Sequence, residues 1–264
     1  MSERVFAVVT MYENPDLLAH FLDHYARLGV HQILVSVRSA EQGELYDSAV
    51  SHAAHFDARV YWASAQRFAD SDKAEVEQTI LEKNGVEPDD YVMHLDMDEF
   101  HEYPASLAEI VRIMNRREAW ALRGWILDRV AEDGTLAPIR SSPSIGEQFP
   151  IGCDLTSGVL KGWTQKIVLC RGRVQLQGGV NHDTCNAWYD DIPIGHGNQY
   201  LVHHFKWTQG VDERLRSRLA HAAFAPCYGD ECQRFLDHYD ARRRIDVRSA
   251  ALRPRWLGAL KYPG

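Results

Sequence analysis

The chain has 264 residues, of which 45% are hydrophobic and 25% are charged, a composition typical of a globular protein with a sizeable core. No stretch approaches the roughly 20 consecutive apolar residues that a membrane-spanning helix needs. The formal net charge of −8 argues against nucleic acid as a partner, because nucleic-acid-binding proteins are normally basic.

The start of the chain and its cysteines both bear on localisation. Residues 1–5 lack the charged n-region, apolar h-region and cleavage site of a signal peptide. The five cysteines are odd in number and scattered along the sequence, so they predict no disulfide framework. These features together predict a cytoplasmic protein in a reducing compartment.

Strands and helices alternate over the first hundred residues. Short apolar runs predict strands at residues 5–10, 33–37, 59–62 and 91–95. Helical spacing and capping signals predict helices at residues 14–28, 43–54 and 71–84. Strands joined by helices through short connections favour parallel pairing. The sequence therefore predicts an α/β fold with a mainly parallel, Rossmann-related central sheet flanked by helices.

The alternation ends after residue 100. Helices are predicted at residues 107–117, 211–223 and 230–243, and strands at residues 120–127, 166–169 and 200–207. Residues 128–200 are rich in Gly and Pro, which is typical of a loop-rich region that shapes a binding site. We expect one domain over residues 1–264.

Three carboxylates follow the predicted strand at residues 91–95, namely Asp96, Asp98 and Glu99. Open α/β sheets bind ligands at the carboxyl ends of their strands. Like charges so close together are unfavourable unless a cation neutralises them, and oxygen ligands suit Mg²⁺ or Mn²⁺. On an extended segment Asp96 and Asp98 point the same way. The alternative is that these acids cap the next helix.

Four segments in chain order carry a family resemblance. They are residues 8–14, 24–30, 94–100 and 203–206. These segments resemble the first strand, the end of the first helix, the acidic segment and the late histidine block of family 2-like glycosyltransferases with a GT-A fold. The chain departs from the family pattern at His203, where Asn is commoner, and at Phe205, where Tyr is commoner.

The resemblance implies a GT-A-like fold with three parts. Residues 1–100 would bind the nucleotide sugar, residues 101–208 would form a loop-rich acceptor and catalytic half, and residues 209–264 would form C-terminal helices and a basic tail. The implied reaction moves a sugar from a UDP- or GDP-sugar to a hydroxyl group of a carbohydrate or other acceptor, with inversion. A bound Mn²⁺ or Mg²⁺ would stabilise the charge of the leaving nucleoside diphosphate.

The resemblance also suggests which residues hold the metal. Asp98 is the first candidate ligand, and Asp96 contacts either the ion or the ribose. His204 matches the late histidine that completes the metal shell in several GT-A enzymes, with a buried structural histidine as the alternative. His203 faces the opposite side of the same strand, because neighbouring strand residues alternate, and is expected to be structural.

Nucleotide contacts are expected where the first two strands end. Thr10, Tyr12 and Glu13 lie at the carboxyl end of the first strand, and Arg38 lies at the end of the second. These positions suit contacts with the base, ribose or phosphate. Turn and capping roles are the alternative for each of them.

An inverting transferase needs a general base within hydrogen-bond reach of the acceptor hydroxyl. Asp183 is the preferred candidate, because it follows a glycine turn and adjoins His182. Asp128 is the second, although its neighbour Arg129 more often indicates an ion pair. Further acids in this half are Glu147 and Asp154.

Two rival functions stay open, a sugar nucleotidyltransferase and a non-catalytic nucleotide- or sugar-binding module. A nucleotidyltransferase usually carries a Gly-rich, basic phosphate loop after its first strand, whereas residues 10–15 contain neither Gly nor Lys nor Arg. Residues 242–264 hold seven Arg and Lys side chains against one Asp. This basic tail predicts peripheral contact with an anionic membrane, with a solvated or subunit-packing tail as the alternative.

Overall fold

A computed structural model describes residues 3–12, 15–64, 70–176, 182–185, 189–190, 200–220 and 226–263. The chain divides into two compact units. Unit 1 comprises residues 1–125, 165–201 and 262–264, and unit 2 comprises residues 126–164 and 202–261. Strand β6 (Ala121–Val130) begins in unit 1 and ends in unit 2.

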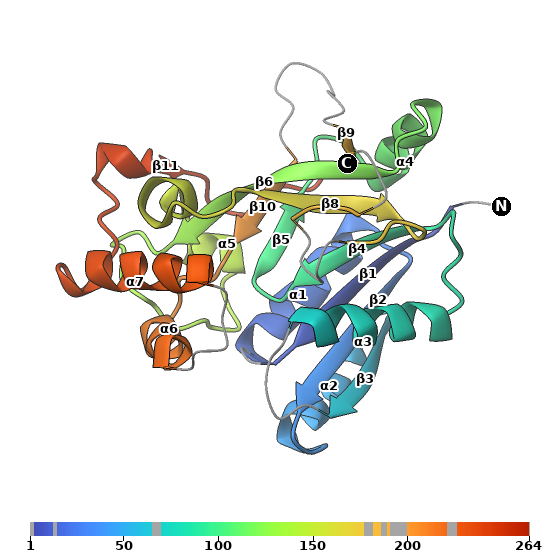
Figure 1. Ribbon diagram of the computed structural model, residues 1–264, viewed down its shortest axis with the longest axis horizontal. Helices are drawn as coiled ribbons and strands as arrows, with labels where there is room; N and C mark the ends of the chain where they lie inside the picture. Colours follow the sequence, from blue (N-terminus) through green and yellow to red (C-terminus); the bar gives the residue numbers. More distant parts are fainter. Residues whose placement is uncertain are drawn as a thin grey trace. The chain divides into compact units, whose positions relative to one another are not determined.

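Unit 1 is built on a parallel sheet with the strand order β4-β1-β2-β3 (Figure 1). The strands are β1 (Val5–Met11), β2 (Gln32–Ser39), β3 (Ala58–Ser64) and β4 (Tyr91–Asp96). Each neighbouring pair is parallel. From β1 the chain adds β2 and β3 on one side and then returns to place β4 on the other. The order thus reverses between β1 and β4, and such a switch point is where open α/β sheets bind ligands.

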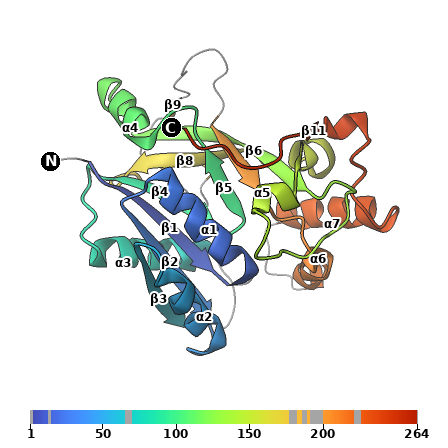
Figure 2. The same ribbon diagram turned by 180° about the vertical axis from the view of Figure 1, so that it is seen from behind.

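Helices cover both faces of this sheet. They are α1 (Pro15–Leu28), α2 (Glu44–Ala53) and α3 (Asp70–Lys83). Helix α3 lies in front of the sheet in Figure 1, and α1 lies in front of it in Figure 2. Helix α1 buries an apolar stripe that includes Leu18, Phe21 and Tyr25, and Gly29, at φ +86°, ends it. The prediction of a mainly parallel sheet flanked by helices is confirmed.

Unit 1 also contains elements from later in the chain. Strand β8 (Gln165–Arg171) pairs antiparallel with β4 and with the first half of β6. The other elements are β5 (Glu99–Glu102), α4 (Leu107–Arg116) and β9 (Tyr189–Asp190). The sequence did not predict β5, because Glu99 and His101 interrupt its apolar pattern. Both side chains are nevertheless 1% exposed.

In unit 2 the second half of β6 starts a short antiparallel sheet. It pairs with β7 (Ile151–Cys153), which pairs in turn with β11 (Arg255–Trp256). Five further elements are α5 (Ile145–Gln148), a π-helix at Thr156–Leu160, β10 (Leu201–His204), α6 (Val211–Ala220) and α7 (Pro226–Asp240). A short 3₁₀ helix spans Ala250–Leu252. The predicted helices at residues 211–223 and 230–243 thus correspond to α6 and α7.

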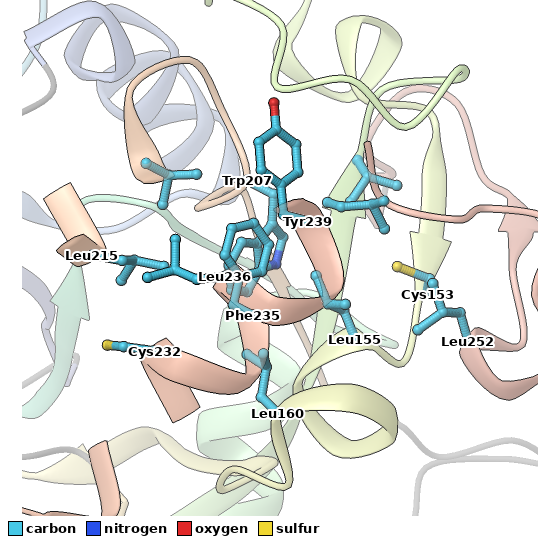
Figure 3. Packing of buried hydrophobic residues seen from close by; sticks show 13 residues of the cluster. Cys153, Leu155, Leu160, Trp207, Leu215, Cys232, Phe235, Leu236, Tyr239 and Leu252 are labelled. Carbon is cyan, nitrogen blue, oxygen red and sulfur yellow. The ribbon is translucent and has the colours of Figure 1, made fainter. Parts of the chain in front are cut away.

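An aromatic stack forms the core of unit 2 (Figure 3). The ring of Trp207 stacks on that of Phe235 with 4.4 Å between centroids, and Tyr239 continues the stack at 5.7 Å from Phe235. Ile245 and Leu252, from the basic tail, are fully buried in the same cluster. Part of the tail is therefore core, and its contact with a membrane stays a prediction.

None of the helices in the described part of the chain combines the length and the apolar character needed to cross a membrane.

Candidate functional site

Four predicted nucleotide-binding residues lie at the ends of three adjacent parallel strands of unit 1. Thr10 of β1 pairs with Asp96 of β4 at the switch point. Tyr12 directly follows β1, and Arg38 is the penultimate residue of β2. The structure therefore brings these four positions to one edge of the sheet. Glu13, the fifth predicted position, lies outside the described residues.

Arg38 is a buried cation with spare hydrogen-bond donors. Arg38 is 6% exposed. Its Nη2 donates a hydrogen bond to Asp72 Oδ2 at 3.3 Å, and its guanidinium carbon lies 5.3 Å from the centroid of the Tyr12 ring. Within the described ranges, neither Nε nor Nη1 has a hydrogen-bond acceptor. Unsatisfied buried donors are costly, so this guanidinium is suited to an acceptor oxygen supplied by a ligand.

Glu77 of α3 forms hydrogen bonds with Thr10 and His94 and an ion pair with Lys73. It accepts a hydrogen bond from Thr10 Oγ1 at 3.0 Å on one oxygen and contacts His94 Nδ1 at 2.9 Å on the other. Lys73 Nζ lies 3.8 Å from it. Burial lowers the pKa of His94, but its contacts with Cys170 and Glu77 outweigh burial and raise that pKa to about 9. His94 is therefore protonated at neutral pH.

The raised pKa of His94 predicts a pH-dependent loss of stability. Because the folded-state pKa lies above the ordinary value of 6.5, the contribution is complete below about pH 6.5 and is lost as the pH rises through about 9. The side chain is 14% exposed, and the shift corresponds to roughly 3 kcal/mol. Urea unfolding between pH 6 and 10 should show this loss in the wild type and not in His94→Gln. Parallel curves for the two proteins would contradict it.

Two lysines hold Asp96. Lys73 Nζ of α3 lies 2.5 Å from Asp96 Oδ1, and Lys166 Nζ of β8 lies 2.7 Å from Oδ2. Lys166 also lies 2.6 Å from Glu99 Oε1. Burial alone would raise the pKa of Asp96, but the two ammonium groups outweigh burial and hold it well below its usual range. Asp96 is therefore an ionised carboxylate whose charge is already neutralised.

These contacts do not fit a divalent cation on Asp96. An ion bound to the same carboxylate would face both ammonium groups, and like charges at short range repel each other. Of the expected ligands, Asp96 and Asp98 belong to unit 1 and His204 to unit 2. Among the residues that the structure describes, no three His, Cys, Asp or Glu side chains form a metal-binding group. The metal set stays a prediction from the resemblance.

Sequence reasoning missed the buried charges around Asp96. They are Lys73, Glu77, His94 and Lys166, of which all but His94 are at most 5% exposed. Two signals were present in the sequence. Lys73 and Glu77 are four residues apart in a predicted helix, a spacing that pairs side chains, and Lys166 opens an otherwise apolar strand. Which charges meet across α3, β4 and β8 depends on tertiary structure.

Asp183 lies beside the start of β8. His182 Nδ1 donates to the carbonyl oxygen of Gln165 at 2.7 Å, and Gln165 is the neighbour of Lys166, which contacts Asp96. Asp183 Oδ1 accepts a hydrogen bond from the backbone N–H of Thr184 at 2.8 Å. This side chain is half-buried. The hydrogen bond of His182 thus places its segment beside the start of β8 within unit 1.

Asp128, the second candidate base, has a structural environment in unit 2. It is 1% exposed and accepts hydrogen bonds from Thr156 N at 2.6 Å, Thr156 Oγ1 at 2.9 Å and Trp207 Nε1 at 2.7 Å. His204 Nδ1 lies 3.1 Å from its Oδ1. Burial alone would raise the pKa of Asp128, but these donors outweigh burial and lower it.

The expected ion pair between Asp128 and Arg129 is replaced by other contacts. Arg129 is fully buried and donates to the carbonyl oxygens of Phe149 and Gly146, both at 2.9 Å. It also lies 3.1 Å from His203 Nδ1. Neighbouring residues of β6 point to opposite sides, so Asp128 meets His204 while Arg129 meets His203.

The remaining acids considered as bases have local roles in unit 2. Glu147 forms a capping box with Ser144 at the start of α5. Asp154 lies 3.9 Å from Arg253 and is 30% exposed.

No protein-family model and no curated protein matches this sequence. Solved structures with a partly similar fold include 4-diphosphocytidyl-2C-methyl-D-erythritol synthase, at 18% identity and a TM-score of 0.37, covering 66% of this chain and 77% of that one. Another is TarS of S. aureus, at 10% identity and a TM-score of 0.38, where the match covers 89% of this chain and 43% of TarS. A mycobacterial protein matches at 13% identity and a TM-score of 0.30, and the match covers 48% of this chain and 41% of that protein. The chain spans less than half of the latter two proteins. Likeness this low carries no argument about function.

Proposed function

We propose that this chain transfers a sugar from a nucleotide-diphosphate sugar, such as a UDP- or GDP-sugar, to a hydroxyl group of a carbohydrate or other acceptor. The observation that carries the proposal is the convergence of Thr10, Arg38 and Asp96 on the carboxyl ends of three adjacent parallel strands. The edge includes the switch point between β1 and β4, where open α/β sheets bind nucleotides. The four sequence segments that resemble family 2-like glycosyltransferases support the same function.

Each residue of this edge has a role in the proposal. Arg38 donates hydrogen bonds to the base or a phosphate, and the Tyr12 ring packs beside it. Asp96, whose side chain is 39% exposed, accepts a hydrogen bond from a ribose or sugar hydroxyl. The proposal routes no step through Mn²⁺ or Mg²⁺, because both oxygens of Asp96 already contact ammonium groups.

Asp183 is the proposed general base. The acceptor hydroxyl attacks the anomeric carbon while the bond to the nucleoside diphosphate breaks, and its proton passes to a carboxylate within hydrogen-bond reach. Asp128 is poorly suited to this role, because it is buried and both of its oxygens are occupied by donors. Within the part of the chain that the structure describes, the half-buried Asp183 accepts a hydrogen bond on Oδ1 from Thr184, and its Oδ2 is available for the acceptor proton.

Replacement of Arg38 should weaken nucleotide binding without unfolding the chain. Arg38→Met removes a charge-assisted donor and should raise the dissociation constant of UDP or GDP by about 10- to 100-fold. Calorimetric titration measures this directly. Arg59→Met, an exposed arginine on β3, is the matched control and should leave the affinity unchanged. Equal affinity of Arg38→Met and wild type would remove Arg38 from the site.

The reaction itself is tested by product analysis. Incubation with a panel of UDP- and GDP-sugars and hydroxyl acceptors should release the nucleoside diphosphate. Release of pyrophosphate from a nucleoside triphosphate and a sugar phosphate would instead identify a nucleotidyltransferase. Binding of UDP or GDP with no turnover of any donor would indicate a binding module.

A further inference from the structure

We propose that Lys73 and Lys166 take the place of a divalent cation at Asp96, so that nucleoside diphosphates bind this chain without Mn²⁺ or Mg²⁺. The identity of the ligand rests on the proposed function. The statement about the cation rests only on the charges around Asp96.

Both oxygens of the Asp96 carboxylate contact a buried ammonium group. The distances are 2.5 and 2.7 Å. The lysine side chains are 5% and 7% exposed, whereas the Asp96 side chain is 39% exposed. The positive charge is therefore buried beneath a carboxylate that faces solvent. A neutral hydroxyl can approach this carboxylate without displacing either lysine.

The two lysines also contact buried carboxylates other than Asp96. Lys73 Nζ lies 3.8 Å from Glu77 Oε1, and Lys166 Nζ lies 2.6 Å from Glu99 Oε1. A divalent ion at Asp96 would face both ammonium groups at short range. Asp98, in the turn that follows β4, is a separate carboxylate, and the inference concerns the cation at Asp96.

Removal of one buried cation should convert this edge into a metal site. Binding of Mn²⁺ alone can be measured by a titration that electron paramagnetic resonance monitors. The wild type should bind no Mn²⁺ below about 1 mM, and Lys166→Gln and Lys73→Gln should bind it at least about tenfold more tightly. Lys83→Gln removes an exposed lysine of the same helix α3 and should behave like the wild type. Micromolar binding of Mn²⁺ by the wild type would overturn the inference, whether or not the buried variants fold.

Nucleotide binding separates this inference from the proposed function. Titration of the wild type with UDP and GDP should give the same dissociation constant in EDTA and in Mn²⁺, within about threefold, because no ion bridges the ligand. Binding that requires Mn²⁺ would overturn the inference and leave the proposed function standing. If neither nucleotide binds in either condition, the proposed function fails, and the titration with Mn²⁺ alone still decides which cation Asp96 takes.

Discussion

Asp183→Asn should slow sugar transfer by about a hundredfold or more, because an acceptor hydroxyl is a weak nucleophile until a base takes its proton. The affinity for UDP or GDP should stay at the wild-type value, since Asp183 is not among the residues proposed to contact the nucleotide. Single-turnover kinetics with a saturating donor measure the first quantity, and calorimetry measures the second.

The pH profile adds a second test of Asp183. Loss of a general base removes the acidic limb of the profile of kcat, whereas a purely structural change lowers the rate equally at every pH. If Asp183→Asn transfers sugar at a near-normal rate, another acid must be the general base. A fall in nucleotide affinity equal to the fall in rate would instead assign Asp183 to binding.

Asp128→Asn should lower the free energy of unfolding by about 3 kcal/mol, because the substitution leaves buried donors that had a charged acceptor without one. Asp128 ties Thr156, Trp207 and His204 together inside unit 2. Chemical denaturation followed by tryptophan fluorescence suits the measurement, since Trp207 belongs to the affected core.

The matched control for Asp128→Asn is Asp154→Asn. Asp154 is 30% exposed and its nearest basic partner is 3.9 Å away, so its replacement should cost less than about 1 kcal/mol. If Asp128→Asn is as stable as the wild type but transfers sugar far more slowly, Asp128 is catalytic and the assignment of Asp183 is wrong.

The first hundred residues were predictable because their pattern is local. Strand β1 is fully buried over Val5–Met11, as its uninterrupted apolar run indicates, and α1 buries residues at helical spacing. The placement of Thr10, Arg38 and Asp96 on one edge follows from the same pattern, because parallel strands end at the same side of a sheet.

The charges and the division into units were not predictable in this way. Lys73 and Lys166 are 93 residues apart in the sequence. Lys166 reaches Asp96 from β8, which pairs with β4, and Lys73 reaches it from helix α3. Likewise, strand β6 reads as one continuous element, although its two halves belong to different units. Such contacts depend on tertiary structure, and the hydrophobic periodicity of the sequence does not predict them.

A crystal structure of the chain soaked with UDP or GDP tests the central claim most directly. We expect the base or a phosphate beside Tyr12 and Arg38, a ribose or sugar hydroxyl at Asp96, and the ammonium groups of Lys73 and Lys166 still in contact with Asp96. A nucleotide bound elsewhere on unit 1 or on unit 2, with this edge empty at saturating concentration, would contradict the account.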